Sequence, residues 1–487
     1  MSKNVQRLAE LTILDIKAGD ALTLFSFLWG AVAIFHVVGP SGAAAHVLSN
    51  PTTVGFSQAV LAMSAIWLMI KPHYNTPLIL VALLGLITAW QEAPVLGNHW
   101  LLAAFINLAL LLSAVATSRH GRLDRDRLAG TFFPLARWCL LLFYSFAAFS
   151  KLNSAFFDTS VSCSTSYFDE TARSLGLDIP LTVGAGGVAL LLPVLTVATE
   201  LSIPILLVAE RTRVFGVALG ISFHSLIALD RLHPFIDFSS VLTALFILFL
   251  PEKLSEAAVG FIKGKGSRLL IMWATVVCIV LTAQWIDLND FMYSAFLQGR
   301  MVLWYIFDAT TITGVAIWLT RHRKQPLKYP FTIRDKRLLW LAVVPTLVAL
   351  NGLLPYFELR TAYAYTMYSN LQMVNGRTNH LIVRSSLPLA GRQANLVKII
   401  RSSDAGLNLY AADDYLLPWD SFRAYLAKHP NVAVIYERGN IGYMVYRAAD
   451  HPELVTPPPL LTQKLLAMRA VDAHNPPRCQ EVFLPAL

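Results

Sequence analysis

The sequence predicts a multi-pass α-helical membrane protein with about eleven transmembrane helices, followed by a small C-terminal α+β domain. Of its 487 residues, 55% are hydrophobic and only 14% are charged, whereas a soluble globular protein carries about 25% charged residues. So few charges cannot cover the surface of soluble domains of this size. Cytosolic enzymes, disordered chains and secreted disulfide scaffolds are therefore excluded.

Eleven apolar runs approach the length of about 20 residues that a bilayer core requires. The predicted spans are 20–38, 54–71, 76–91, 100–117, 131–150, 181–208, 214–229, 236–250, 269–286, 301–320 and 338–355. The third run is the weakest of them and could be re-entrant instead. In that case every later segment would lie on the opposite side of the membrane.

The placement of positive charge favours one orientation. With residues 1–19 as a cytoplasmic N-terminus, the cytoplasmic segments hold 21 Lys and Arg and the opposite loops hold 4. Short cytoplasmic loops are enriched in these residues. The charge distribution therefore supports a transmembrane domain of eleven spans at 20–355, followed by a C-terminus on the extracytoplasmic side. The net charge of +9 thus reflects membrane topology, and the expected partner is the lipid bilayer rather than a nucleic acid. No signal peptide is expected, because residues 1–18 are polar.

Residues 356–487 change in character and predict an extracytoplasmic α+β domain. Short strands are expected at 380–383, 396–400, 432–436 and 441–446, and helices at 419–428 and 460–468. The last two strands flank Arg438-Gly439-Asn440, a hairpin-like turn. Either Asp420 or Pro418 is expected to cap the first helix.

The four cysteines fall into two groups. Cys139 and Cys278 lie inside predicted spans, whereas Cys163 and Cys479 lie on the outer side. Oxidising conditions there allow a disulfide between Cys163 and Cys479, and two free thiols are the alternative. No spacing of Cys and His predicts a metal site.

Ionisable residues inside spans are costly, so they are expected to be paired or functional. Arg137 and Glu200 lie at similar depths on successive spans. We expect them to form a structural ion pair, with a proton relay as the alternative. Asp308 and His224 lie deeper, and His224 is either a ligand contact or a hydrogen-bonded core histidine.

Two polar runs mark the outer ends of neighbouring spans. Asn98-His99-Trp100 opens the fourth span and Ser150-Lys151-Leu152-Asn153 closes the fifth. Taken alone, Lys151 could extend to the interface and His99 could cap a helix. If both side chains face one cavity, desolvation favours the neutral amine of Lys151, which could then act as a general base.

Three segments resemble the vitamin-K-dependent γ-glutamyl carboxylase and the broader HTTM (horizontally transferred transmembrane) family. The run 143–153, with Lys151 before Leu152, is similar to the aromatic and small residues that precede the family's Lys-Leu-Asp. Asn98-His99-Trp100-Leu101-Leu102 resembles its Asn-His-x-Tyr-Leu stretch. The block from Glu200 to His224 resembles its Glu, Pro, Arg-x-Arg and Phe-His pattern. The resemblance covers about residues 10–355.

This chain departs from the family at two places. Phe156 stands near the position of the family's tryptophan, and no glycine follows Lys151 before Gly176. Only 132 residues follow the last predicted span, whereas the carboxylase has a much larger luminal region that binds a propeptide. A propeptide-bearing substrate is therefore not expected.

The resemblance implies a mechanism and a set of site residues. Lys151 would deprotonate a reduced naphthoquinone, and O2 would convert this vitamin-K-like quinol to an epoxide while generating a strong base. That base would remove a γ-proton from glutamate, and CO2 would capture the carbanion. His99 would position or stabilise the oxygenated intermediate, and Trp100, Tyr144 and His224 would contact the quinone. Trp100 and Tyr144 suit an interfacial aromatic belt equally well.

Three functions follow as alternatives. The first is a quinol-dependent membrane enzyme with lyase or oxygenase chemistry on a peptide or small-molecule substrate, and it expects Lys151 and His99 to reach one cavity. The second is a non-enzymatic scaffold or maturation factor that acts through residues 356–487, with no cavity at Lys151. The third, a transporter or lipid-handling protein, is disfavoured because no inverted repeat is visible.

Overall fold

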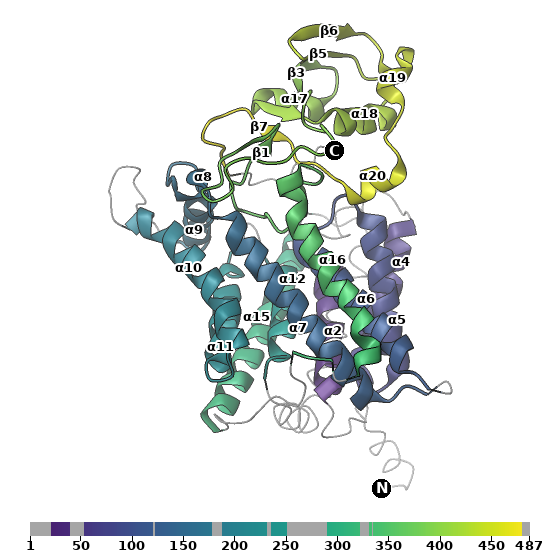
Figure 1. Cartoon of the computed structure of the whole chain (residues 1–487), viewed down its shortest axis with the longest axis vertical. Helices are drawn as coiled ribbons and strands as arrows, with labels where there is room; N and C mark the ends of the chain where they lie inside the picture. Colours follow the sequence, from purple (N-terminus) through teal and green to yellow (C-terminus); the bar gives the residue numbers. More distant parts are fainter. Residues whose placement is uncertain are drawn as a thin grey trace. The chain divides into compact units, whose positions relative to one another are not determined.

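The computed structural model describes residues 21–38, 53–119, 122–177, 188–230, 235–250, 290–321, 331–333 and 335–479 (Figure 1). Five of the described helices are long and apolar enough to cross a membrane: Ala21–Val38, Asn98–Thr117, Arg125–Ser150, Ala189–Val208 and Lys336–Phe357. Three shorter apolar helices are Gly55–Ile70, Arg213–Ile227 and Ile236–Ile247. The predicted class, a helical protein with several membrane-compatible helices, is thus confirmed.

The predicted spans coincide with helices wherever the structure describes them. The helices are α2 (Ala21–Val38), α4 (Thr53–Ile70), α5 (Asn75–Glu92), α6 (Asn98–Thr117), α7 (Arg125–Ser150), α10 (Val188–Val208), α11 (Arg213–Ile227), α12 (Ile236–Ile247), α15 (Asp290–Arg321) and α16 (Val343–Leu353). The third prediction, the weakest in sequence, is the continuous 18-residue helix α5. The predicted span 269–286, with Cys278, lies outside the described residues. Short 3-10 helices, η2 (Lys336–Ala342) and η3 (Leu354–Phe357), flank α16.

The chain divides into two compact units. The first comprises Met1–Gln91, His99–Leu141 and Ser202–Thr346. The second comprises Glu92–Asn98, Leu142–Leu201 and Leu347–Leu487. The C-terminal residues therefore pack as one body with the ends of several helices.

Helices pack against helices in the first unit. Nearly all residues of α2 are buried, as expected for a helix that is apolar around its whole circumference. Helix α2 contacts α4 and α12, and α11 contacts α12. The contact between α11 and α12 requires a glycine, because a Cβ atom on Gly220 would lie 2.3 Å from the ring of Phe246.

The second unit contains a five-stranded antiparallel sheet in the order β6-β5-β3-β4-β7. Its strands are β3 (Val397–Ser402), β4 (Tyr415–Leu417), β5 (Val434–Arg438), β6 (Ile441–Val445) and β7 (Val471–Asp472). The predicted hairpin is confirmed: Gly439 and Asn440 join β5 to β6 with φ angles of 57° and 64°. A two-residue turn with both φ angles positive suits the twist of a hairpin.

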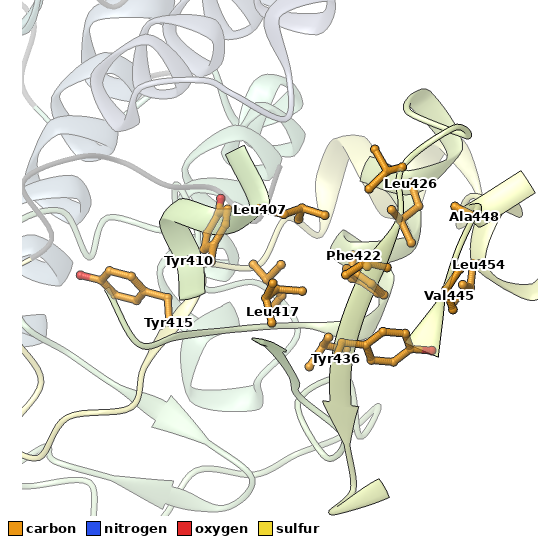
Figure 2. Packing of buried hydrophobic residues seen from close by; sticks show 14 of the residues in the cluster. Leu407, Tyr410, Tyr415, Leu417, Phe422, Leu426, Tyr436, Val445, Ala448 and Leu454 are labelled. Carbon is orange, nitrogen blue, oxygen red and sulfur yellow. The ribbon is translucent and has the colours of Figure 1, made fainter. Parts of the chain in front are cut away.

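Helices α17 (Ala405–Ala412) and α18 (Trp419–Lys428) contribute to the core of this sheet. Helix α18 has the predicted bounds, and Pro418, one of the two expected caps, is its N-cap residue. Its buried residues Phe422 and Leu426 are one helical turn apart and join the apolar cluster in Figure 2. The later helix α20 (Leu460–Leu465) is shorter than predicted.

The predicted strand at 380–383 is wrong. His380 Nδ1 accepts hydrogen bonds from the backbone N–H groups of Ile382 and Val383, at 3.0 and 3.1 Å. These bonds fold the chain back on the imidazole ring, so the two residues do not join a ladder. A short ribbon of β1 (Met373–Val374) and β2 (Arg377–Thr378) forms just before this segment.

Candidate functional site

Lys151 directly follows α7 and its side chain is buried. Its Nζ atom lies 2.9 Å from Oε2 of Glu200, which projects from α10. The side chains of this pair are only 6% and 12% exposed. Nζ also donates to Ala147 O at 3.4 Å. The predicted site lysine therefore belongs to a buried ion pair.

The predicted ion pair between Arg137 and Glu200 is corrected by this geometry. Glu200 pairs with Lys151, whereas Arg137 Nε donates to the backbone oxygen of Leu248 at 2.9 Å. The guanidinium group also lies 5.8 Å from the ring centroid of Phe249. Similar depth along two helices does not specify a pair, because the rotation of each helix about its axis decides which side chains meet.

The C-terminal residues hold the turn that carries Lys151. Asn153 Nδ2 donates to the backbone oxygens of Ser150 and Ser369, and its Oδ1 accepts from Phe156 N, which caps α8 (Ser154–Phe157). His380 Nδ1 accepts two backbone hydrogen bonds. Its Nε2 therefore carries the proton and donates to Phe149 O at 2.9 Å.

Burial lowers the pKa of His380, although the hydrogen bond to Phe149 O opposes this shift. The neutral form of the ring is the one that the two backbone donors require. The last turn of α7 is thus tied to a neutral histidine 231 positions away in the sequence.

The segment before His380 contains three tyrosines in left-handed backbone conformations. The φ angles are 54° at Tyr363, 60° at Tyr365 and 51° at Tyr368, values that bulky residues rarely adopt. Such conformations persist only where surrounding contacts enforce them. Tyr365 N donates to Asn98 Oδ1 at 2.7 Å, and the Tyr365 ring packs edge-on against Phe143 at 5.0 Å.

His99 forms a second buried ionisable pair, in the first unit. Its Nε2 lies 2.9 Å from Oδ2 of Asp237, in the first turn of α12, and the residues are 6% and 3% exposed. Asp237 Oδ1 also accepts from Phe238 N at 2.8 Å. Because a carboxylate only accepts, Nε2 of His99 is the donor in this pair.

Sequence reasoning missed Asp237. The available signal was an acidic residue at the start of a predicted span, where an unpaired charge is costly. The deeper Asp308, by contrast, accepts a hydrogen bond from Ser225 Oγ at 2.8 Å, which gives it a structural contact.

The residues expected to contact a quinone lie in both units. Trp100 stacks on His36 with ring centroids 3.6 Å apart, and the structure describes no acceptor for its buried Nε1. His224 packs edge-on against Phe238 at 4.9 Å, and His99 lies 5.5 Å from the same ring. His224 and His99 therefore border one phenylalanine.

Tyr144 lies on α7, seven residues before Lys151. This spacing places the two residues on the same face of the helix. Tyr144 is only 3% exposed and interacts electrostatically with Glu200. A buried aromatic ring thus accompanies the Lys151–Glu200 pair.

Cys163 and Cys479 form a disulfide, the bonded alternative of the two that the sequence left open. Cys163 is the first residue of α9 (Cys163–Ser174). The bond joins residues 316 positions apart within the second unit. Cys139 is a buried free thiol. Over the residues that the structure describes, no group of three or more His, Cys, Asp or Glu could hold a metal ion.

His99 and Lys151 belong to different compact units, and the expectation that they face one cavity stays a prediction. Comparison with protein-family models, curated proteins and solved structures finds no match for this chain. A function for it must therefore be inferred from the two buried pairs, Lys151–Glu200 and His99–Asp237, and from the residues around them.

Proposed function

We propose that this chain is an eleven-span membrane enzyme with a cytoplasmic N-terminus and an extracytoplasmic C-terminus. It couples oxygenation of a reduced naphthoquinone to proton abstraction, and to carboxylation with CO2, on the extracytoplasmic side. The observation that carries the proposal is the buried pair of Lys151 and Glu200. The ratio of 21 to 4 positive charges supports the orientation. The resemblance of the residues around His99 and Lys151 to γ-glutamyl carboxylase supports the reaction class.

In this proposal Lys151 acts as the general base, and Glu200 is its partner in the buried pair. The Nζ and Oε2 atoms are 2.9 Å apart, and the two side chains are only 6% and 12% exposed. Few water molecules can therefore compete with a substrate for the amine.

The His99–Asp237 pair supplies the second function. Asp237 keeps the proton on Nε2, so Nδ1 of His99 can accept a proton or a hydrogen bond from a reacting group. In this role His99 would position or stabilise the oxygenated intermediate. Asp237 acts through His99 and is a positioning residue.

The residues present fit a flat aromatic cofactor. Trp100 Nε1 is buried without an acceptor among the described residues, and a quinol oxygen is a suitable acceptor. His224, in the same unit as Trp100, would provide an apolar contact. When bound, a reduced naphthoquinone would supply an acidic hydroxyl group and, with O2, the oxidation that produces a base stronger than an amine.

The proposal is tested with the purified chain in lipid nanodiscs, supplied with reduced vitamin K and O2. We expect O2 consumption and epoxide formation that disappear in Lys151→Ala. The control is Lys464→Ala, which removes another lysine whose Nζ donates to a backbone oxygen, that of Ala93 at 2.6 Å. A cooperative melting transition above the assay temperature would show that each variant is folded.

Two results would contradict the proposal. The first is epoxide formation at the wild-type rate in Lys151→Ala. The second is the absence of turnover in the wild-type chain. Either would favour a scaffold or maturation function of residues 356–487.

A further inference from the structure

An exposed apolar segment follows His380. In residues 381–389, here called the apolar loop, Leu381, Ile382, Leu387 and Leu389 are 58%, 62%, 55% and 59% exposed. Single exposed aliphatic residues are normal on a protein surface, but a group of four within nine residues indicates a binding surface.

The apolar loop is bonded to the ends of two helices that are long enough to cross a membrane. Leu381 N donates to Leu152 O at 2.8 Å, just beyond the end of α7. Leu387 N donates to Tyr356 O at 2.9 Å, in the last turn of the helical segment Lys336–Phe357. Because the ends of a spanning helix lie at the membrane surface, both ends of the apolar loop lie at this depth.

A buried serine anchors the middle of the apolar loop. Ser386 is buried, and its Oγ donates to Glu358 Oε1 at 2.6 Å. The same carboxylate is fully buried and accepts from the backbone N–H groups of Asn375 and Gly376. This anchor in the middle of the loop keeps the flanking leucines on the outside.

Helix α20 repeats this arrangement. Leu460, Leu461 and Leu465 are 60%, 61% and 46% exposed. Lys464, on the same helix, donates to Ala93 O at 2.6 Å, directly after the predicted span that forms α5. A second set of aliphatic side chains is therefore held next to the end of a predicted span.

We propose that the apolar loop, together with α20, inserts its aliphatic side chains into the boundary between headgroups and acyl chains of the leaflet that the C-terminal residues face. Lipid is the expected occupant because the bonds to Leu152 and Tyr356 place the loop at the depth of that boundary. The exposed Arg384 between the apolar residues suits the lipid phosphates. The inference requires that the two helices span the membrane and is independent of any catalytic activity.

Collision measurements on nitroxide labels test the proposal. Ile382→Cys and Leu387→Cys are each labelled in a Cys139→Ala/Cys278→Ala background, with the chain in lipid nanodiscs. The matched control is Leu409→Cys, because Leu409 is an aliphatic residue of α17 that is 57% exposed. Accessibility to O2, which concentrates in lipid, is compared with accessibility to the water-soluble nickel complex NiEDDA.

We expect the labels at 382 and 387 to collide more with O2 and less with NiEDDA than the label at 409. NiEDDA accessibility at 382 and 387 equal to that at 409 would overturn the proposal. All three labels replace exposed side chains, and an unchanged size-exclusion profile verifies that each variant is folded. The collision measurements do not depend on quinol turnover. Failure of the proposed enzyme activity and failure of the proposed membrane insertion are therefore distinguishable.

Discussion

Replacing Glu200 with Gln removes the carboxylate that faces Lys151 and leaves the amine in the same buried position. The side chains of the pair are 6% and 12% exposed, so water can replace little of the lost interaction. Removing one member of a buried ion pair costs about 3–5 kcal/mol. At about 1.4 kcal/mol per factor of ten, this lowers the folding equilibrium constant by roughly 10²–10⁴.

The free energy of unfolding can be measured by steric trapping in bicelles. The matched control is Glu210→Gln, an exposed glutamate beyond the end of α10, which should change stability by less than about 0.5 kcal/mol. Lys151→Met and the double variant Lys151→Met/Glu200→Gln complete a double-mutant cycle. The double variant should cost less than the sum of the single variants, because it leaves no buried charge without its partner.

Two outcomes would refute this reasoning. Glu200→Gln could cost no more than Glu210→Gln, or the two single effects at Lys151 and Glu200 could add. A second cycle, with Arg137→Met and Glu200→Gln, should be additive. Strong coupling in that cycle would support the ion pair between Arg137 and Glu200 that the sequence predicted.

Three further predictions concern other contacts. Asp237→Asn should abolish most quinol turnover, because His99 loses the carboxylate that orients its ring. The same change should lower the free energy of unfolding by about 1–3 kcal/mol. Unchanged turnover in the epoxide assay would contradict this prediction. Burial lowers the pKa of His380 in the folded chain below the value of about 6.5 for an unfolded chain. As the pH falls, the unfolded chain therefore binds a proton at this residue before the folded chain does. The free energy of unfolding should fall as the pH drops below about 6.5. Melting temperatures measured between neutral and acidic pH should depend less on pH in His380→Phe than in the wild-type chain. The same pH dependence in both chains would contradict the prediction. Gly352→Ala should lower the free energy of unfolding by about 1–3 kcal/mol, because the new Cβ would lie 2.3 Å from the ring of Phe146. The control is Gly314→Ala in α15, where no atom lies within 4 Å of the new Cβ. In the same unfolding assay this control should cause no such loss.

Elements whose signals are local were predicted well. Helix α18 has the predicted bounds because Pro418 starts it and Phe422 and Leu426 repeat at helical spacing. The turn at Gly439 was visible because its residue types favour positive φ angles. The strand expected at 380–383 failed because a histidine side chain took the backbone N–H groups that a ladder needs.

The sequence singled out ionisable residues that need a partner, but it did not identify the partners. Lys151, Glu200, His99 and Arg137 stood out because ionisable groups in or beside apolar runs are costly. Their partners depend on how the helices are rotated and packed, which no pattern within one helix records. Asp237 was missed for the same reason.

The sequence by itself determined the class of this protein: apolar runs of membrane-spanning length, their helical conformation and the residues that need a partner. These properties follow from the hydrophobicity and spacing of residues along a single segment. Only the tertiary structure decided that Lys151 pairs with Glu200 and that His99 pairs with Asp237, 138 positions away. It also decided that the apolar loop is bonded to the ends of two helices. Contacts between segments depend on the packing of both partners, so the physical reason for each pair appears only when the helices and the C-terminal residues come together.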